Sequence, residues 1–193
     1  MLSKASSLTP ALGHGDVIRG LPLWPEGEFY TRPDEAAGEW PWYYMSRNRK
    51  ADWNKPAYTV LANGRHVTLH PASPAMEMEW SDLDDGWKQR WRFTRRYEHL
   101  AADPSRPLLE RPRRLSWREC AALQTFRADF VPPGSLMRKY ELVGNAVPPA
   151  LAEALLVPLI DGSALNRARP LDLEELFRPS KPRAVRKTTS RSS

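Results

Sequence analysis

The pattern of apolar and polar positions divides the chain into an irregular first half and a more helical second half. Between Asp16 and Pro107 apolar residues come in short runs, of which Tyr58–Leu61 and Val67–Leu69 indicate strands. Proline and glycine are spaced too closely in this region for long helices. We therefore expect an irregular, β-rich module over residues 16–107.

A first helix is predicted to begin at Ser116. Ser116 and Glu119 have the spacing of a capping box, in which each side chain satisfies a free backbone amide of the other residue. The apolar residues that follow carry this helix to about Phe126.

A second helix is predicted to begin near Pro148 and Pro149, because the missing amide of proline costs nothing in a first turn. Pro158 should kink or end this helix. Its apolar positions recur at helical spacing; they are Leu151, Ala154, Leu155 and Leu159.

The two ends of the chain offer little to bury. Residues 1–15 are small and polar, so we expect a flexible amino terminus. Leu171–Phe177 is a possible short helix, and residues 178–193 hold six basic residues and no acidic ones. We expect a basic, disordered tail over residues 161–193. It either adds non-specific affinity for nucleic acid or is a solvated tail with no role.

Charge and cysteine content narrow the choice of partner and compartment. The net charge is +6 and the pI about 9.7, which favours an anionic partner, nucleic acid first. Cys120 is the single cysteine, so an intrachain disulfide is excluded and a cytosolic compartment fits. No apolar run suits a signal peptide or a membrane span. The sequence predicts a cytoplasmic protein with no membrane association.

Two segments carry a specific pair of motifs. Residues 113–126 read RRLSWRECAALQTF, and residues 140–155 read YELVGNAVPPALAEAL. They resemble the ninth and tenth sequence motifs of the DNA cytosine-5 methyltransferase family, in the family's order and approximate spacing. The ninth motif departs at Trp117 and Arg127, where proline is usual, and at Ala122, where arginine is usual.

The resemblance implies an α+β chain with two parts. An irregular β-rich target recognition domain over residues 16–107 would precede helices over residues 108–160, which complete the Rossmann-like α/β domain of a partner. Asn145, Ala146 and Val147 would line the S-adenosylmethionine pocket, although Asn145 is equally suited to cap a helix. The structural residues of the two motifs would be Arg118, Glu119, Gln124 and Gly144.

Residues 42–71 resemble the target recognition regions of some bacterial members of the family. Such regions often carry a threonine followed by an apolar residue, here Thr59-Val60 or Thr68-Leu69. Basic side chains can contact phosphates or read guanine edges, and polar ones can bond to bases. The DNA-contacting candidates are Arg47, Asn48, Arg49, Lys50, Thr59, Asn63, Arg65 and His66. The alternative is a charged, solvated loop.

The segments that perform the family's chemistry do not occur in this sequence. The family uses a cysteine nucleophile in Pro-Cys-Gln, a glutamate in Glu-Asn-Val and a cofactor turn of the form Phe-x-Gly-x-Gly. Cys120 follows Glu119 inside a predicted helix and is expected to be a small buried hydrophobe. Residues 13–15, GHG, have no strand before them. Residues 88–96, KQRWRFTRR, are either a phosphate-facing basic segment or a solvated helix face.

We therefore expect no catalytic residue and no metal site in this chain. The sequence predicts the DNA-recognition and cofactor-pocket part of a prokaryotic or phage DNA cytosine-5 methyltransferase. Duplex DNA, S-adenosylmethionine and a partner chain carrying motifs one to eight would be its ligands and partners. Without that partner the final helix would be exposed, so the isolated chain should aggregate, dimerise or partly unfold. The alternatives are a non-catalytic, sequence-specific DNA-binding module and an inactive remnant.

Overall fold

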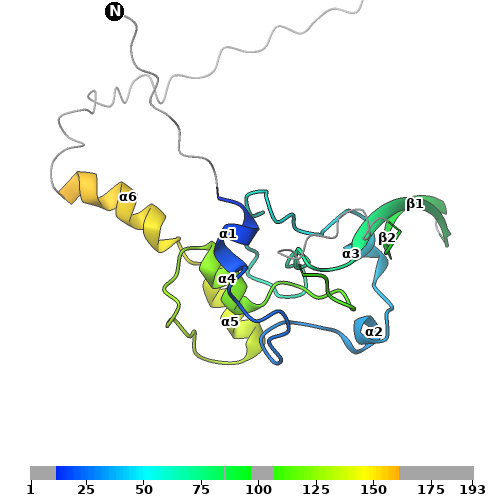
Figure 1. Cartoon of the computed structure of the whole chain (residues 1–193), viewed down its shortest axis with the longest axis horizontal. Coiled ribbons are helices and arrows are strands. Elements are labelled where there is room, and N and C mark those ends of the chain that lie inside the picture. The colour runs from blue at the N-terminus through cyan, green and yellow to red at the C-terminus, as the bar shows by residue number, and fades with distance from the viewer. Residues whose placement is uncertain (1–11, 85, 97–106, 161–193) are drawn as a thin grey trace, which may run out of the picture. The chain divides into compact units, whose positions relative to one another are not determined.

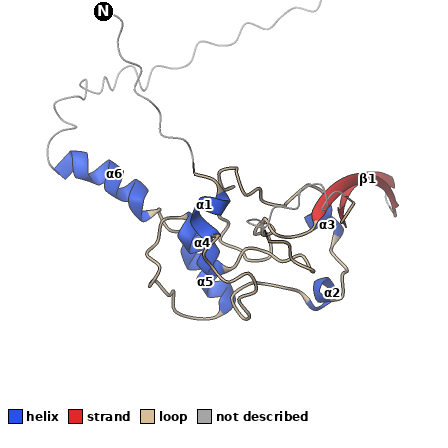
Figure 2. Ribbon diagram, in the orientation of Figure 1, coloured by secondary structure: helices blue, strands red, loops and turns tan. Residues whose placement is uncertain are grey.

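Short helices joined by long irregular segments make up most of the chain in this computed structural model, which describes residues 12–84, 86–96 and 107–160. The helices are α1 (His14–Ile18), α2 (Pro33–Ala36), α3 (Trp42–Met45), α4 (Trp117–Leu123), α5 (Leu136–Gly144) and α6 (Pro149–Ile160). The strands are β1 (Ala75–Leu83) and β2 (Gly86–Thr94) (Figures 1 and 2). The chain divides into two units, Met1–Ala152 and Glu153–Ser193, and the boundary falls within α6. The described part is thus a small α+β structure.

Strands β1 and β2 form an antiparallel hairpin with a register running from Ala75↔Thr94 to Leu83↔Gly86. Gly86 has a φ of +109°, a conformation that favours glycine, and ends the turn. Side chains alternate between the two faces of the hairpin. One face carries Met76, Met78 and Trp80; on the other, Arg92 lies 2.9 Å from Glu77 and 3.0 Å from Glu79.

The two strands predicted from the sequence do not form. Tyr58–Leu61 has no regular structure, and within Val67–Leu69 only Leu69 pairs, in isolated bridges with Lys50 and Arg114. Their β-branched and aromatic composition favours an extended backbone, but a strand also needs a neighbour that continues the ladder. The helical alternative for residues 88–96 is wrong as well, because this segment forms β2 through Thr94.

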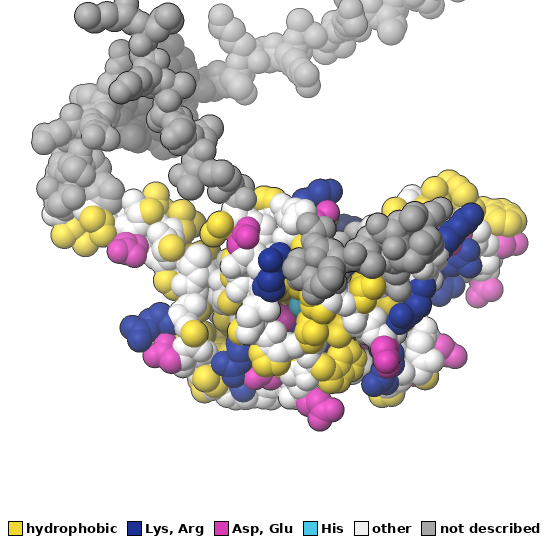
Figure 3. Space-filling model, viewed as in Figure 1, with side chains coloured by type: hydrophobic (Ala, Val, Ile, Leu, Met, Phe, Trp, Pro, Cys, Tyr) yellow, Lys and Arg dark blue, Asp and Glu magenta, His cyan; other side chains and the backbone are white. Residues whose placement is uncertain are grey.

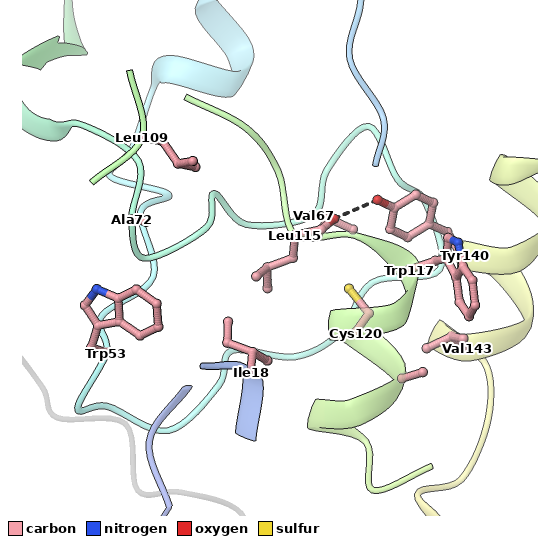
Figure 4. Close-up of a cluster of buried hydrophobic side chains, with 11 residues drawn as sticks. Ile18, Trp53, Val67, Ala72, Leu109, Leu115, Trp117, Cys120, Tyr140 and Val143 are labelled. Atoms are coloured by element: carbon pink, nitrogen blue, oxygen red, sulfur yellow. Dashed lines mark hydrogen bonds between the residues drawn. The ribbon is translucent and has the colours of Figure 1, made fainter. Parts of the chain in front are cut away.

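The main core lies where α1, α4 and α5 meet the irregular segments (Figure 4). Ile18, Trp117 and Val143 come from these helices, and Trp53 and Val67 come from the segments between them. Buried Tyr140 also donates its hydroxyl to the carbonyl of Leu115, 2.6 Å away. The small core therefore ties residues of α4 and α5 to residues of the first 70.

Helix α4 begins as the sequence predicts. The Ser116 hydroxyl accepts from the Glu119 amide at 3.1 Å, and the Glu119 carboxylate accepts from the Ser116 amide at 2.7 Å. The helix ends at Leu123, short of the expected Phe126, because Thr125 adopts a left-handed φ of 64°. Amides of Thr125 and Phe126 then bond back to the carbonyls of Ala122 and Ala121. This closure usually uses glycine, since a β-branched residue is strained there.

Helix α5 lies between the two helices predicted from the sequence and was not itself predicted. Its amino-terminal cap is Ser135, whose hydroxyl accepts from the Arg138 amide. Leu136, Tyr140 and Val143 follow at spacings of four and three residues and face the core, against α4. That spacing indicates a helix, but the glycines at Gly134 and Gly144 are more typical of a loop.

Helix α6 begins at Pro149, as predicted, and continues to Ile160, so Pro158 does not end it. Among the described residues no helix is long and apolar enough to cross a membrane. The expected tail over 161–193 and the possible helix Leu171–Phe177 lie outside the described residues. So do residues 1–11 of the expected flexible amino terminus, whereas His14 and Gly15 are buried in α1.

Candidate functional site

Two consecutive buried arginines fix the ninth-motif segment to the first part of the chain. The Arg113 guanidinium makes a bidentate pair with Glu119 at 2.8 and 2.7 Å. Arg114 makes a bidentate pair with Glu35 of α2, with Nη2 2.7 Å from Oε1. Successive side chains of an extended segment point to opposite sides, so the two arginines anchor different elements. The sequence gives no sign of the Arg114–Glu35 pair, because 79 residues separate its members.

A buried histidine completes the carboxylate site of Glu119. His70 Nδ1 accepts from the Ala72 amide at 3.0 Å, which leaves Nε2 protonated and 3.4 Å from Glu119 Oε1. Burial, with the nearby positive charge of Arg113, lowers the pKa of His70 to about 2. His70 is therefore neutral, and Arg113 carries the charge that balances Glu119.

The first candidate DNA loop, residues 47–50, is folded onto α3. The Asn48 side-chain oxygen accepts from the Lys50 amide at 2.9 Å. Arg49 donates from Nε to the carbonyl of Tyr44 at 2.8 Å, and its guanidinium lies 4.6 Å from the centre of the Tyr44 ring. Arg49 and Lys50 are half-buried, so Arg47 and Asn48 are the more exposed of the four candidates.

The second candidate loop, residues 63–66, repeats the same local turn. The Asn63 side-chain oxygen accepts from the Arg65 amide at 3.0 Å. Buried Arg114 donates from Nε to the carbonyl of Arg65 at 3.1 Å, which fixes the backbone of the loop from inside. Asn63 and Arg65 are exposed, while half-buried His66 lies with its ring centre 5.9 Å from that of Tyr43.

Helix α3 supports both loops. The Tyr44 carbonyl holds Arg49, and the Tyr44 hydroxyl donates to the carbonyl of Val67, directly after the second loop, at 2.6 Å. Seven of the eight candidates thus lie in two turns held by one short helix. Thr59 lies apart from them, exposed, at the edge of a cavity of about 10 Å³ that also touches His14 and Cys120.

A surface cavity of about 450 Å³ adjoins the first loop. Asn48 and Lys50 line it together with Lys55, Asp52 and Tyr58. The rest of the lining is apolar and includes Trp53, Met76 and Leu108, so the cavity has a mixed character.

The tenth-motif turn between α5 and α6 carries the three pocket candidates. Asn145 and Val147 are exposed and Ala146 is half-buried. Asn145 is the carboxy-terminal cap of α5, with its amide 3.1 Å from the carbonyl of Glu141. A capping role thus exists at this residue, though at the end of α5 and not at the start of α6.

Three contacts fix this turn. A Cβ on Gly144 would lie 2.4 Å from the backbone Cα and N of Ala62, so only glycine permits this approach. Gln124 Nε2 donates to the carbonyl of Val143 at 2.7 Å. The hydroxyl of strained Thr125 accepts from the Ala150 amide at 3.0 Å, in the first turn of α6. The turn is therefore held by the ninth-motif segment and by the chain just before the second candidate loop.

Comparison with known proteins places this arrangement in a family. The model of the family described as "C-5 cytosine-specific DNA methylase" matches residues 26–160, which is most of the chain. This chain belongs to the C-5 cytosine-specific DNA methylase family. The match covers both candidate loops, the buried arginine pairs and the α5–α6 turn.

Curated relatives of this methylase-family chain are type II methyltransferases. M.FnuDI of Fusobacterium nucleatum is 40% identical over 116 residues, which is 60% of this chain and 28% of the relative. M.MthTI of Methanothermobacter thermautotrophicus is 38% identical over 114 residues, 58% of this chain and 29% of the relative. M.BspRI of Lysinibacillus sphaericus is 30% identical over 158 residues, 77% of this chain and 31% of the relative. The chain spans less than a third of the length of these relatives.

The remaining motif residues of this chain make contacts within it. Arg118 pairs with Glu28 at distances of 2.9 to 3.1 Å. Because of this hydrogen bond to Glu28, the pKa of Arg118 is raised. All three of the motif residues in or next to α4 bind residues outside this helix; they are Arg118, Glu119 and Gln124. Their structural role in the DNA-recognition domain stays a prediction.

Cys120 of this methylase-family chain is unsuited to nucleophilic chemistry. Its side chain is buried in the core, 1% exposed, and burial raises the pKa of its thiol far above the usual range. The thiolate is the reactive form of cysteine. Over the described ranges there is also no group of three or more metal-ligating His, Cys, Asp or Glu side chains.

Proposed function

We propose that this chain is the DNA-recognition and cofactor-pocket-completing part of a DNA cytosine-5 methyltransferase. The whole enzyme would methylate cytosine in duplex DNA with S-adenosylmethionine. The observation that carries the proposal is the contact of Gly144 with Ala62. Through it, the pocket turn and the segment leading to the second DNA loop form one packed unit, as a part serving both functions requires.

Target recognition would rest on the two turns held by α3. Arg47 and Arg65 are exposed and basic, and Asn48 and Asn63 are exposed beside them. Arginine can make bidentate hydrogen bonds to guanine, and asparagine to adenine. The buried pair between Arg114 and Glu35 would keep the second turn in a fixed shape, which lowers the entropy lost on binding DNA.

The cofactor pocket would be completed by residues 145–147. The turn presents an exposed amide side chain at Asn145 and an exposed apolar side chain at Val147. This pair fits a ligand with polar groups next to a ring, and S-adenosylmethionine is such a ligand. When bound, the cofactor supplies the methyl group, while these residues position it.

The nucleophile would come from a partner chain carrying motifs one to eight. Cys120 is buried and protonated, so it cannot add to the cytosine ring. Helix α6 is apolar except for Glu153, and Leu155 and Leu159 are 59% and 57% exposed. Helices of this composition are normally covered, and a partner would supply the cover for this one. We place the assembled enzyme in the cytoplasm of a prokaryote or phage-infected cell.

Methyl transfer from labelled S-adenosylmethionine to duplex DNA tests the proposal, with the chain alone and with a methyltransferase polypeptide that carries Pro-Cys-Gln. We expect activity only in the mixture. Asn145→Ala should then raise the KM for the cofactor, whereas Asn54→Ala, an exposed asparagine away from the turn, should not. Activity of the chain alone would contradict the missing nucleophile. Binding of DNA without activity in any mixture would favour a non-catalytic DNA-binding module.

A further inference from the structure

The surface of α3 that faces away from the core carries two adjacent exposed aromatic side chains. Trp42 is 37% exposed and Tyr43 is 40% exposed, although their neighbours Tyr44 and Met45 are fully buried. The hydrophobic effect does not explain two large exposed rings side by side, and exposed aromatic groups of this kind often mark binding surfaces.

Positive charge adjoins both rings. Lys88 of β2 places its ammonium 5.0 Å from the centre of the Trp42 ring. Arg32 pairs with Asp34 at 3.2 Å, and its interaction with the Tyr43 side chain is the largest cause of a raised pKa of its guanidinium. Cations next to aromatic faces suit a sugar-phosphate backbone, since phosphates meet the cations while sugars pack against the rings.

The aromatic pair is continuous with the proposed recognition loops. The Tyr43 ring lies 5.9 Å from that of His66 in the second loop. The first loop follows α3 directly, and Arg49 returns to bond the Tyr44 carbonyl. A duplex lying on Arg47 and Arg65 would therefore pass close to α3.

We infer that Trp42, Tyr43 and Lys88 extend the DNA interface along α3 and bind the DNA backbone beside the recognition sequence. The inference rests on the proposed function of the two loops. Its contacts are to sugar and phosphate, so they would strengthen binding to every sequence and would not choose among sequences.

The hairpin offers a matched comparison surface. Trp80 and Trp87 are 61% and 68% exposed. By the strand register, their face also carries Met78, Gln89, Trp91 and the acidic Asp82, but no basic side chain. Figure 3 shows such yellow apolar side chains over the hairpin beside dark blue basic ones. Loss of Trp80 therefore removes an exposed indole of similar size without touching the proposed DNA surface.

The test is the affinity of the full chain for a fluorescent duplex, measured by anisotropy over a range of salt concentrations. Trp42→Ala should weaken binding on the order of tenfold on specific and unrelated sequences alike, and Trp42→Phe should restore most of it. Lys88→Gln should lower the slope of log affinity against log salt by about one. Trp80→Ala should leave affinity and slope unchanged.

Other results would overturn the inference. Equal losses for Trp42→Ala and Trp80→Ala would mean general destabilisation, which circular dichroism of each variant checks independently. Unchanged DNA binding by Trp42→Ala, with weaker pairing to the catalytic polypeptide, would assign the surface to a protein partner. If Arg47→Ala weakens binding but Trp42→Ala and Lys88→Gln do not, this inference fails and the proposed function stands. If the unaltered chain does not bind DNA, both fail.

Discussion

At the scale of single residues, two buried ion pairs hold separate segments of this chain in fixed positions. Arg113, Arg114, Glu35 and Glu119 have side chains that are at most 1% exposed, and each carboxylate receives two guanidinium hydrogen bonds. Two buried ion pairs are a large share for a small core. These pairs fix the geometry of the segments more than they stabilise the fold. The free-energy cost of moving four charges out of water offsets much of their attraction.

Glu119→Gln should destabilise the chain by about 3–5 kcal/mol, because it leaves the buried Arg113 guanidinium without a compensating charge. Chemical denaturation followed by tryptophan fluorescence measures the change. The control is Asp129→Asn, which breaks the exposed pair with Arg127 and should leave stability unchanged within error. Similar small effects of the two substitutions would show that Arg113 finds other partners.

His70 should make stability depend on pH. Its pKa is about 2 in the folded chain, against 6.5 when exposed, so the unfolded chain binds more protons between these values. The stabilisation is complete above about pH 6.5 and is lost as the pH falls, by up to about 1.4 kcal/mol per pH unit. Melting temperatures of His70→Gln should fall less steeply from pH 7 to pH 5 than those of the unaltered chain. Parallel slopes for His70→Gln and the unaltered chain would reject this origin.

At the scale of elements, two unusual backbone positions place the α5–α6 turn. Thr125 is held at a φ of 64° and uses its hydroxyl to accept from Ala150. Glycine would relieve the strain but remove this bond, so the threonine exchanges local strain for a fixed start of α6. Gly144 allows the turn to lie against the backbone of residues 61–62.

Gly144→Ala should cost about 1–3 kcal/mol or more, because the added Cβ meets backbone atoms that cannot rotate away. It should also weaken DNA binding, since residues 61–62 lead into the second loop. Gly20→Ala is the control: a Cβ there meets nothing within 4 Å, and stability should stay the same or rise slightly. If the two variants have the same unfolding midpoint, the turn can shift to accommodate the added Cβ.

Local sequence signals predicted the elements whose stabilising partners are close in the chain. The Ser116–Glu119 box and the start of α6 at Pro149 were predicted, because caps act within one turn. The hairpin was missed, although Met76, Met78 and Trp80 alternate with Glu77 and Glu79 and a turn sequence DDG follows. Tyr58–Leu61 was mistaken for a strand, because no sequence pattern shows whether a neighbouring strand exists.

The sequence predicted which residues could contact DNA, but it did not predict how these residues are brought together on one surface. The asparagine-led turns at 48–50 and 63–65 follow from local hydrogen bonding. Their support by Tyr44 and Arg114 depends on contacts between residues 23 to 79 positions apart. Such contacts leave no trace in one sequence, and so α3 was not recognised as the element that holds both loops.

At the scale of the whole molecule, α6 should govern solution behaviour. Leu155 and Leu159 are more than half exposed on a helix whose only charged residue is Glu153. We expect the full chain alone to self-associate, and Leu155→Gln with Leu159→Gln to reduce the apparent mass in sedimentation. The same pair should weaken complementation by a catalytic polypeptide. Val131→Gln, an exposed apolar position outside α6, is the control. A monodisperse monomer that melts sharply would contradict this expectation.

The buried pair between Arg114 and Glu35 also constrains protein engineering. A chimera that exchanges residues 42–71 between relatives to change the target site would keep this pair and would carry α3, with its Tyr44–Val67 contact, inside the graft, but it would replace the Arg65 carbonyl that Arg114 holds. The graft therefore succeeds only if its backbone presents that carbonyl in the same place. Donor segments should be selected by loop length between the two asparagine turns before any matching of side chains.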